Sequence, residues 1–239
     1  MLRYLAPLVL LIAAPAGAQE TQIAPPASAT PPAEVAPPAA VTPPAEVAPP
    51  AVVAPPAPVA APAPKFATVR VTLTTTLGPI VLELEKQRAP ITTANFLRYI
   101  AEKRYDGTDF YRATKIQPGY GLIQGGTANF PKRALPGIAH EPTSKTGLTH
   151  ADGTISMART KPGTATGDFF ITIGALTSLD ADPAKPGDNL GFAAFGHVVE
   201  GMDVVRRILE APISTTKGTG ALKGQMLADP VKIVTARRG

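Results

Sequence analysis

Hydrophobic and polar residues alternate from Val69 onward and predict a β-hairpin. The stretch VRVTLTTTLGPIVLELE, residues 69–85, places apolar side chains at every second position on both sides of a break at Leu77-Gly78-Pro79. A period of two is typical of strands with one buried face, and a Gly-Pro pair marks the turn that joins them. We therefore expect two paired strands at the start of the folded part.

Two later stretches have the wider spacing of amphipathic helices. In residues 89–107, Pro90 stands at the first helical position, apolar residues recur every three or four positions, and basic residues precede Gly107. Proline at the start, basic residues in the last turn and glycine beyond it are ordinary helix signals. The stretch GMDVVRRILE, residues 201–210, predicts a second helix.

Further short apolar runs predict six more strands. They are FYRAT (110–114), GLIQGG (121–126), GTISMAR (153–159), FFITIG (169–174), AAFGHV (193–198) and PVKIVTARR (230–238). About eight short strands with two separated helices do not alternate as βαβ units do. We therefore predict a mainly β fold, a closed eight-stranded antiparallel barrel capped by two α-helices, in which closure removes the exposed sheet edges.

The front of the chain has a different composition. Residues 1–18 carry Arg3, then an apolar run that is far shorter than the roughly 20 residues of a spanning helix, then small residues at Ala16 and Ala18. This order predicts a signal peptide over residues 1–18, cleaved after Ala18. We therefore expect an exported, periplasmic protein with no stable membrane insertion after cleavage.

More than half of the 28 prolines lie before residue 65, in a segment where proline pairs repeat every six residues. A polyproline II helix has about three residues per turn, so the pairs fall on one edge of a semi-rigid spacer. We predict a Pro/Ala-rich disordered linker over residues 19–66 and a folded domain over residues 67–239. The alternative, a ligand for an SH3-like partner, usually has a basic residue beside the prolines, and none occurs between Gln19 and Lys65.

Charge and cysteine content exclude several classes of function. The chain has no cysteine and a net charge of +5, and residues 65–239 carry about +7 because Arg3 and three glutamates leave −2 before them. The basic residues are scattered rather than clustered with aromatic ones, so we expect no nucleic-acid binding. The three histidines and the acidic residues near Asp180 lack metal-ligand spacing, and no G-x-S-x-G motif surrounds Ser156. We therefore expect no metal site and no serine hydrolase.

Polar residues interrupt two of the apolar strands. In FYRAT, strand parity places Phe110, Arg112 and Thr114 on one face, and in GLIQGG it places Leu122 and Gln124 on one face. Arg112 and Gln124 line one groove if the two strands pair, and the glycines after Gln124 let a ligand or backbone come close. The alternative to a functional groove is a structural interpretation, in which Arg112 lies at a strand end and Gln124 on the surface.

Taken in chain order, the motifs resemble those of the cyclophilin family of peptidyl-prolyl cis/trans isomerases. After the hairpin and the first helix come F-x-R, Q-G-G, S-M-A-R, G-x-F-F-I, an A-x-F-G strand and a G-M-x-V-V helix. Each motif is weak alone, but their order and spacing over residues 69–236 are specific. The resemblance implies the eight-stranded barrel and isomerase activity on proline-containing polypeptides without a cofactor. We expect the chain to act as a monomer.

The resemblance also assigns site residues. It places the family's catalytic arginine at Arg112, its groove glutamine at Gln124 and the floor of its proline pocket at Phe170. The substrate-binding positions of the family fall on Tyr120, Leu122, Met157, Ala158, Asp168, Leu179 and Phe192.

The chain also departs from the family's pattern. It is longer between Arg112 and Gln124, so either Tyr120 or Gly121 stands in for the family's pocket aromatic, and the segment ADPAKPGDN is inserted after Asp180. Three further positions differ: aspartate for glutamine at Asp168, serine for tryptophan at Ser178, and phenylalanine for histidine at Phe192. These replacements motivate the alternative of a catalytically weak binding module or chaperone.

Overall fold

The computed structural model describes residues 65–184 and 186–239. The predicted signal peptide, and the predicted linker except for its last two residues, lie outside the described residues. Within the described part, none of the helices combines the length and the apolar character needed to cross a membrane.

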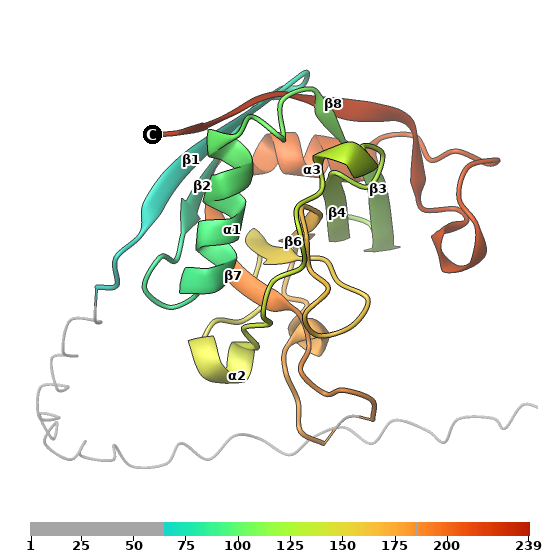
Figure 1. Ribbon diagram of the computed structural model, residues 1–239. Coiled ribbons are helices and arrows are strands. Elements are labelled where there is room, and N and C mark those ends of the chain that lie inside the picture. The colour runs from blue at the N-terminus through green and yellow to red at the C-terminus, as the bar shows by residue number, and fades with distance from the viewer. Residues whose placement is uncertain (1–64, 185) are drawn as a thin grey trace, which may run out of the picture. The chain divides into compact units, whose positions relative to one another are not determined.

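Eight antiparallel strands close into a barrel (Figure 1), and this confirms the predicted fold class. The order around the barrel is β1-β2-β7-β5-β6-β4-β3-β8, and pairing of β1 with β8 completes the closure. The strands are β1 Val69–Thr75, β2 Gly78–Leu84, β3 Thr108–Gln117, β4 Tyr120–Gly126, β5 Thr154–Met157, β6 Phe169–Ile173, β7 Ala193–Glu200 and β8 Met226–Arg238.

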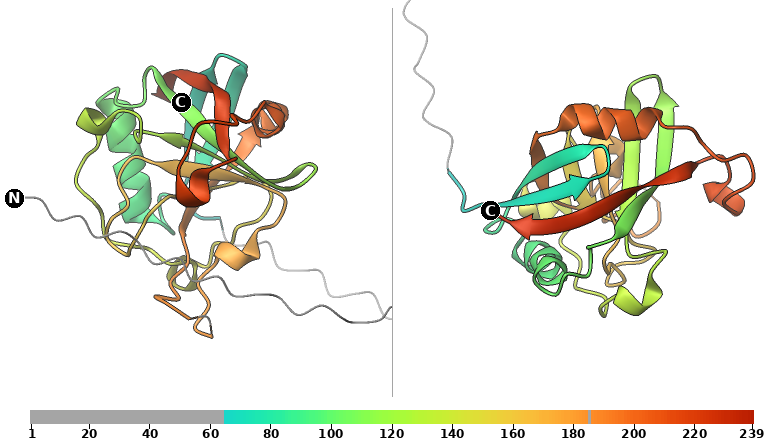
Figure 2. Two further views of the ribbon diagram at one scale, coloured as in Figure 1. Left: turned by 90° about the vertical axis from the view of Figure 1, so that its right-hand side faces the viewer. Right: turned by 90° about the horizontal axis from the view of Figure 1, so that it is seen from above.

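Two longer helices cover the barrel, as predicted. Helix α1, Pro90–Ala101, contacts β7 and β8, and helix α3, Met202–Glu210, contacts β2, β3 and β4. Figure 2 shows them on opposite sides of the barrel. The structure adds a single turn that the sequence did not predict, α2 at Thr143–Thr146, and three short 3-10 turns, η1 Pro131–Arg133, η2 Thr177–Leu179 and η3 Gly220–Leu222.

Several predicted boundaries are shifted, among them those of the first hairpin and the first helix. The first hairpin turns at Thr76 and Leu77, because Gly78 already pairs with Thr75 as the first residue of β2. Helix α1 ends at Ala101 and not beside Gly107, because Lys103 adopts a left-handed conformation with a φ of 52° that a helix does not continue through.

A buried aromatic cluster joins α1 to the barrel. Phe96 of α1 lies 4.9 Å from Tyr105 and 5.3 Å from both Phe169 and Phe195, measured between ring centroids. All four side chains are fully buried. Because such rings bury large apolar areas, this cluster stabilises the inner face of β6, on which Phe169 lies. The residue after Phe169, Phe170, points to the opposite face of the strand.

The start of α1 is capped from a distant segment. Ala89 at the N-cap position has no side chain that can accept a hydrogen bond. The carboxylate of Glu141 accepts hydrogen bonds from the backbone N–H of Ile91 at 3.1 Å and from the N–H and hydroxyl of Thr92 at 2.7 and 2.6 Å. A negative charge at this end also suits the helix dipole, so Glu141 fixes α1 to the loop before α2.

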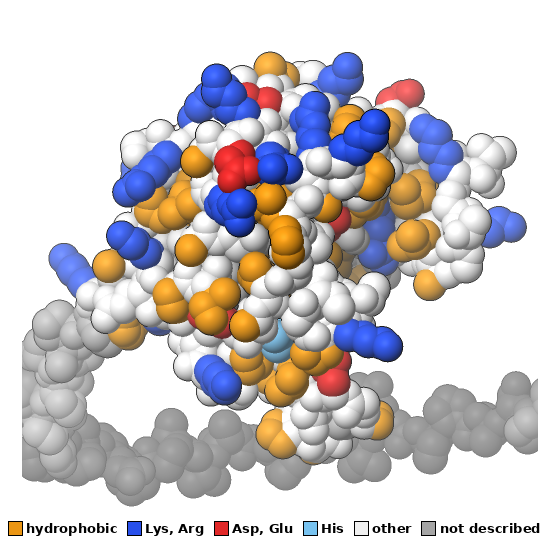
Figure 3. All heavy atoms as spheres, in the orientation of Figure 1, with side chains coloured by type: hydrophobic (Ala, Val, Ile, Leu, Met, Phe, Trp, Pro, Cys, Tyr) orange, Lys and Arg blue, Asp and Glu red, His pale blue; other side chains and the backbone are white. Residues whose placement is uncertain are grey.

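The charges on the face shown in Figure 3 are mixed. Lys and Arg side chains are spread over it, with Asp and Glu between them and hydrophobic side chains in the gaps. Exposed ion pairs of opposite charge also occur in the described chain, such as Arg98 with Glu102 at 2.7 Å. This face of the described residues therefore carries no single basic patch.

Candidate active site

Arg112 and Gln124 are cross-strand partners in β3 and β4, as the groove interpretation expects. The prediction that Phe110 shares a strand face with Arg112 is wrong, however. The pairing register shifts between Phe110 and Arg112, so Tyr111 is an extra residue that forms a β-bulge. As a result Phe110 is fully buried in the core, while Arg112 is only partly buried and faces the groove.

Two amide oxygens hold the guanidinium of Arg112. Its Nη1 donates to Oε1 of Gln124 at 2.7 Å, and its Nε donates to Oε1 of Gln225 at 2.9 Å. Oε1 of Gln225 also accepts the hydroxyl of Thr114 at 2.8 Å. Burial lowers the pKa of Arg112, but a guanidinium remains charged at neutral pH. No carboxylate of the described chain pairs with it, so its charge is oriented but not neutralised.

The hydrogen bonds continue from Gln124 to a carboxylate. Nε2 of Gln124 donates to the hydroxyl of Tyr111 at 2.8 Å, and this hydroxyl donates to Oδ1 of Asp168 at 3.2 Å. The backbone N–H of Ala128 donates to the same oxygen at 2.9 Å. Burial raises the pKa of Asp168 and of Tyr111. Asp168 therefore anchors the far end of a chain of hydrogen bonds that begins at Arg112.

A cavity of about 240 Å³ lies beside the guanidinium. Its lining residues are Arg112, Leu122, Gln124, Ala158, Arg159, Phe170, Leu179 and Phe192. The rings of Phe170 and Phe192 meet edge to face with centroids 5.4 Å apart. The cavity is therefore polar on the side of Arg112 and Gln124 and apolar on the side of the two rings.

The structure gathers most of the predicted site residues around this cavity, but two of the predicted substrate-binding residues do not line it. Met157 is fully buried in the barrel core, because it shares the inward parity of Ile155 in β5 and only Ala158 emerges into the cavity. Tyr120 donates its hydroxyl to the carbonyl of Ala175, and its ring covers Gly174. Tyr120 is therefore directed away from the cavity and does not line it.

Asp168 lines a neighbouring cavity of about 300 Å³ rather than the first one. The two cavities share Gln124, Ala158 and Arg159. They are thus adjoining parts of one groove.

Residues 70–238 match the family described as cyclophilin type peptidyl-prolyl cis-trans isomerase/CLD. The chain belongs to this family. A peptidyl-prolyl cis-trans isomerase of Acinetobacter baylyi is 35% identical over 174 residues, which cover 72% of this chain and 86% of the relative. Peptidyl-prolyl cis-trans isomerase B of Escherichia coli is 36% identical over 150 residues, which cover 58% of this chain and 82% of the relative.

A solved structure has the same fold. It is a cyclophilin type peptidyl-prolyl cis-trans isomerase of Cryptosporidium parvum, with a TM-score of 0.58 and 23% identity, and the match covers 72% of this chain and 98% of that one. The chain is therefore a cyclophilin-type peptidyl-prolyl cis-trans isomerase, with the eight-stranded barrel of that family.

In this cyclophilin, two groove residues were missed by sequence reasoning. Gln225 orients Arg112 from just before β8, 113 positions further along the chain, and no spacing rule connects them. Arg159 lines both cavities. A signal for Arg159 did exist, because it follows Ala158 in the S-M-A-R motif.

A line of hydrogen-bonded side chains, Asp180, His150 and Ser156, lies behind Phe170, the floor of the cavity. Nδ1 of His150 is 2.5 Å from Oδ1 of Asp180, and Nε2 of His150 is 2.9 Å from the hydroxyl of Ser156. The imidazole stacks on the Phe170 ring, with centroids 5.8 Å apart and 13° between the planes. Sequence motifs gave no sign of this Asp-His-Ser line. Ser156 has no exposed surface, so the line supports Phe170 rather than presenting a nucleophile.

Burial lowers the pKa of His150, although the hydrogen bond to Asp180 opposes this effect. Across the described chain, no three side chains among His, Cys, Asp and Glu gather closely enough to hold a metal ion. The polar groups that line the two cavities are the guanidiniums of Arg112 and Arg159, the amide of Gln124, several hydroxyls and the carboxylate of Asp168.

Proposed function

We propose that this chain accelerates cis/trans isomerisation of X–Pro bonds in exported polypeptides, acting as a monomer. The observation that carries the proposal is the position of Arg112. Its charged guanidinium is held by Gln124 and Gln225 at the edge of an apolar cavity walled by Phe170 and Phe192. That cavity has the chemical character to hold a proline ring beside a fixed charged donor.

The reaction needs a donor more than it needs a nucleophile. Resonance gives the C–N bond double-bond character, so rotation faces a barrier of about 18 to 20 kcal/mol and takes tens of seconds unaided. In the twisted transition state the prolyl nitrogen becomes pyramidal and regains its lone pair. A donor such as Arg112 that is directed at this nitrogen binds the transition state more tightly than the planar ground state.

The remaining groove residues orient the substrate. Phe170, Leu122 and Phe192 hold the proline ring, and Gln124 holds a backbone group while the preceding carbonyl rotates. A turnover on the order of 10³ per second corresponds to a barrier near 13 kcal/mol, so about 5 to 7 kcal/mol must be supplied. A charged hydrogen bond in a water-poor pocket, together with orientation, can supply this amount.

The proposed site of action is the periplasm of a Gram-negative-like cell, with envelope proteins as substrates. The support is the order of charge, apolar run and small residues in positions 1–18, followed by the proline-rich stretch. Mass spectrometry of the protein from periplasmic and cytoplasmic fractions tests this. We expect a periplasmic species that starts at Gln19, whereas an intact cytoplasmic chain that starts at Met1 would contradict export.

A second candidate is a binding module that holds proline-containing segments without turning them over. Ser178 and Phe192, which stand where the family has tryptophan and histidine, motivate it. A protease-coupled isomerisation assay on the purified protein separates the two candidates. The free peptide isomerises in tens of seconds, and we expect the rate of isomerisation of the bound peptide to be at least about a thousandfold higher. Binding of the peptide with no acceleration would favour the module.

A further inference from the structure

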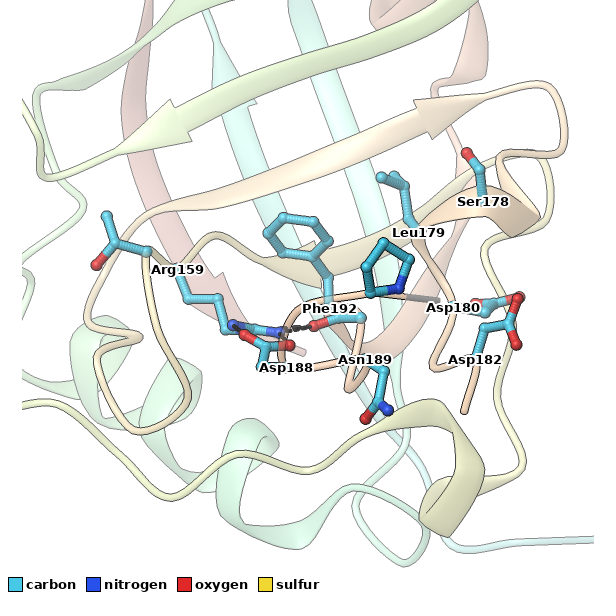
Figure 4. Close-up of a pocket in the computed structure, with 11 residues that line it drawn as sticks. Arg159, Ser178, Leu179, Asp180, Asp182, Asp188, Asn189 and Phe192 are labelled. Atoms are coloured by element: carbon cyan, nitrogen blue, oxygen red, sulfur yellow. Dashed lines mark hydrogen bonds and ion pairs between the residues drawn. The ribbon is translucent and has the colours of Figure 1, made fainter. Parts of the chain in front are cut away.

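The inserted segment between Asp180 and Phe192 is tied to the groove by one arginine (Figure 4). Nη1 and Nη2 of Arg159 donate to the two carboxylate oxygens of Asp188 at 2.7 and 2.8 Å. Nε of Arg159 donates to the carbonyl of Gly191 at 2.9 Å. The Arg159 side chain is only 6% exposed while that of Asp188 is 39% exposed, so the two parallel hydrogen bonds of this fork-shaped pair fix its geometry although its acidic end is open to solvent.

Neighbouring contacts fix the end of the same segment. Nε2 of His140 lies 3.1 Å from the carbonyl of Leu190, and the N–H of Phe192 donates to the carbonyl of Leu179 at 2.9 Å. Gly191 has a φ of +58°, and a Cβ atom there would lie 2.4 Å from the Leu179 carbonyl oxygen. The chain therefore enters Phe192 along one path, which these contacts define.

Phe192 touches both the tie and the cavity. The guanidinium carbon of Arg159 lies 5.5 Å from the centroid of the Phe192 ring, within the range of a cation–π contact. The same ring packs edge to face against Phe170, the floor of the cavity. The position of the Phe192 wall thus depends on a side chain whose other bonds hold the inserted segment.

We propose that Arg159 is a positioning residue, which holds the Phe192 ring as a wall of the proline pocket by tying the inserted segment to the groove. This inference rests on the proposed function. It adds to that function the residue that sets the fit of the pocket around the proline ring. Arg159 acts through Phe192, so its removal affects substrate binding more than the rotation step.

Kinetics of Arg159→Gln test the inference. We expect the KM for a proline peptide to rise about fivefold, with kcat changed less than about twofold, because a loosened wall weakens binding without moving Arg112. In a Phe192→Ala background the same substitution should give no further rise in KM. Arg206→Gln is the matched control, because it removes an exposed arginine paired with Asp152 far from the groove, and it should leave both constants unchanged.

A milder variant guards against misfolding of Arg159→Gln. Asp188→Asn removes one charge from an acid that is 39% exposed, while the bond from Arg159 to Gly191 remains. We expect a rise in KM of about twofold that also vanishes in the Phe192→Ala background. An equal rise in both backgrounds, or no rise in either, would overturn the inference.

A readout without turnover separates this inference from the proposed function. The chain has no tryptophan, so Phe192→Trp places the chain's single tryptophan at the pocket wall. We expect acrylamide to quench this tryptophan more strongly once Arg159→Gln is added, because the ring is no longer held. Unchanged quenching would overturn the inference even in an active enzyme. An inactive wild type with this quenching response would instead contradict only the proposed function.

Discussion

Nη1 of Arg112 donates a hydrogen bond to Oε1 of Gln124 over 2.7 Å, across paired positions of β3 and β4. The orientation of that amide is set at its other end, where Nε2 donates to Tyr111, and Tyr111 in turn donates to Asp168. Every donor in this line points from the guanidinium toward the carboxylate, so each bond polarises the next. Arg112 is therefore oriented before a substrate arrives, which is the condition for electrostatic catalysis.

Gln225 is predicted to be as important as Gln124 for orienting the guanidinium of Arg112. Gln225→Leu removes the oxygen that accepts from Nε of Arg112 and from Thr114, so the guanidinium gains freedom to turn away. We expect kcat to fall about tenfold, the effect of roughly 1.4 kcal/mol, with little change in Tm because Gln225 is only partly buried. Assays and melts on Gln225→Leu and on the exposed neighbour Lys223→Ala check this. A kcat within twofold of the wild type would show that Gln225 does not orient the arginine.

The sequence predicted the barrel because alternation and turn residues are local signals. It also predicted seven of the eight residues that line the cavity, because the order of the motifs indicated the family and the family's site positions could be assigned together. Strand parity failed at Tyr111, since a bulge inserts a residue that alternation cannot foresee. At Met157, by contrast, strand alternation would have given the correct burial. Met157 lies two residues after Ile155 and therefore faces the core with it.

Long-range partnerships were beyond the reach of sequence reasoning. Arg112 meets Gln225 only because β3 lies beside β8 in the closed barrel. His150 joins Asp180 and Ser156 only because η2 returns toward β5. Neither contact follows from the spacing of residues along the chain, because both depend on how the barrel brings distant segments together.

Stability is predicted to fall on mild acidification. Burial lowers the folded-state pKa of His150 below its ordinary value of 6.5. The unfolded chain then binds more protons than the folded one, so this stability is complete above about pH 6.5 and is lost as the pH falls below it. We expect a lower Tm at about pH 5.5 than at about pH 7.5, and a smaller difference in His150→Asn. His140, whose pKa burial also lowers, accounts for a remaining difference. An undiminished difference in His150→Asn would contradict the assignment.

The proline-rich front is predicted to be dispensable for chemistry. A chain that begins at Lys65 retains every residue that lines the cavity, together with Gln225. We expect its kcat/KM on short peptides to lie within twofold of that of the chain beginning at Gln19, because a six-residue proline repeat that forms no apolar face to dock is expected to act as a spacer. A tenfold or greater loss would show that the front completes the site.

Cyclosporin is predicted to inhibit weakly. The family resemblance implies that sensitive members offer a tryptophan where this chain has Ser178, and a serine supplies neither the indole N–H nor an aromatic wall. Losing both should cost about 2 to 4 kcal/mol, a factor of about 30 to 1,000 in affinity. We expect inhibition at micromolar drug, with Ser178→Trp recovering part of the sensitivity. Inhibition titrations on both forms check this, and nanomolar inhibition of the wild type would overturn it.

The most direct test of the account is the kcat/KM of Arg112→Ala on an X–Pro peptide, measured beside its Tm. The guanidinium faces the groove and not the core, so the barrel should keep its Tm within a few degrees. Removal of one preorganised charged donor should lower kcat/KM about 10²- to 10³-fold. Arg112→Lys should recover little, because a point charge cannot hold both Gln124 and Gln225. A folded Arg112→Ala variant with wild-type kcat/KM would contradict the central role given to this arginine.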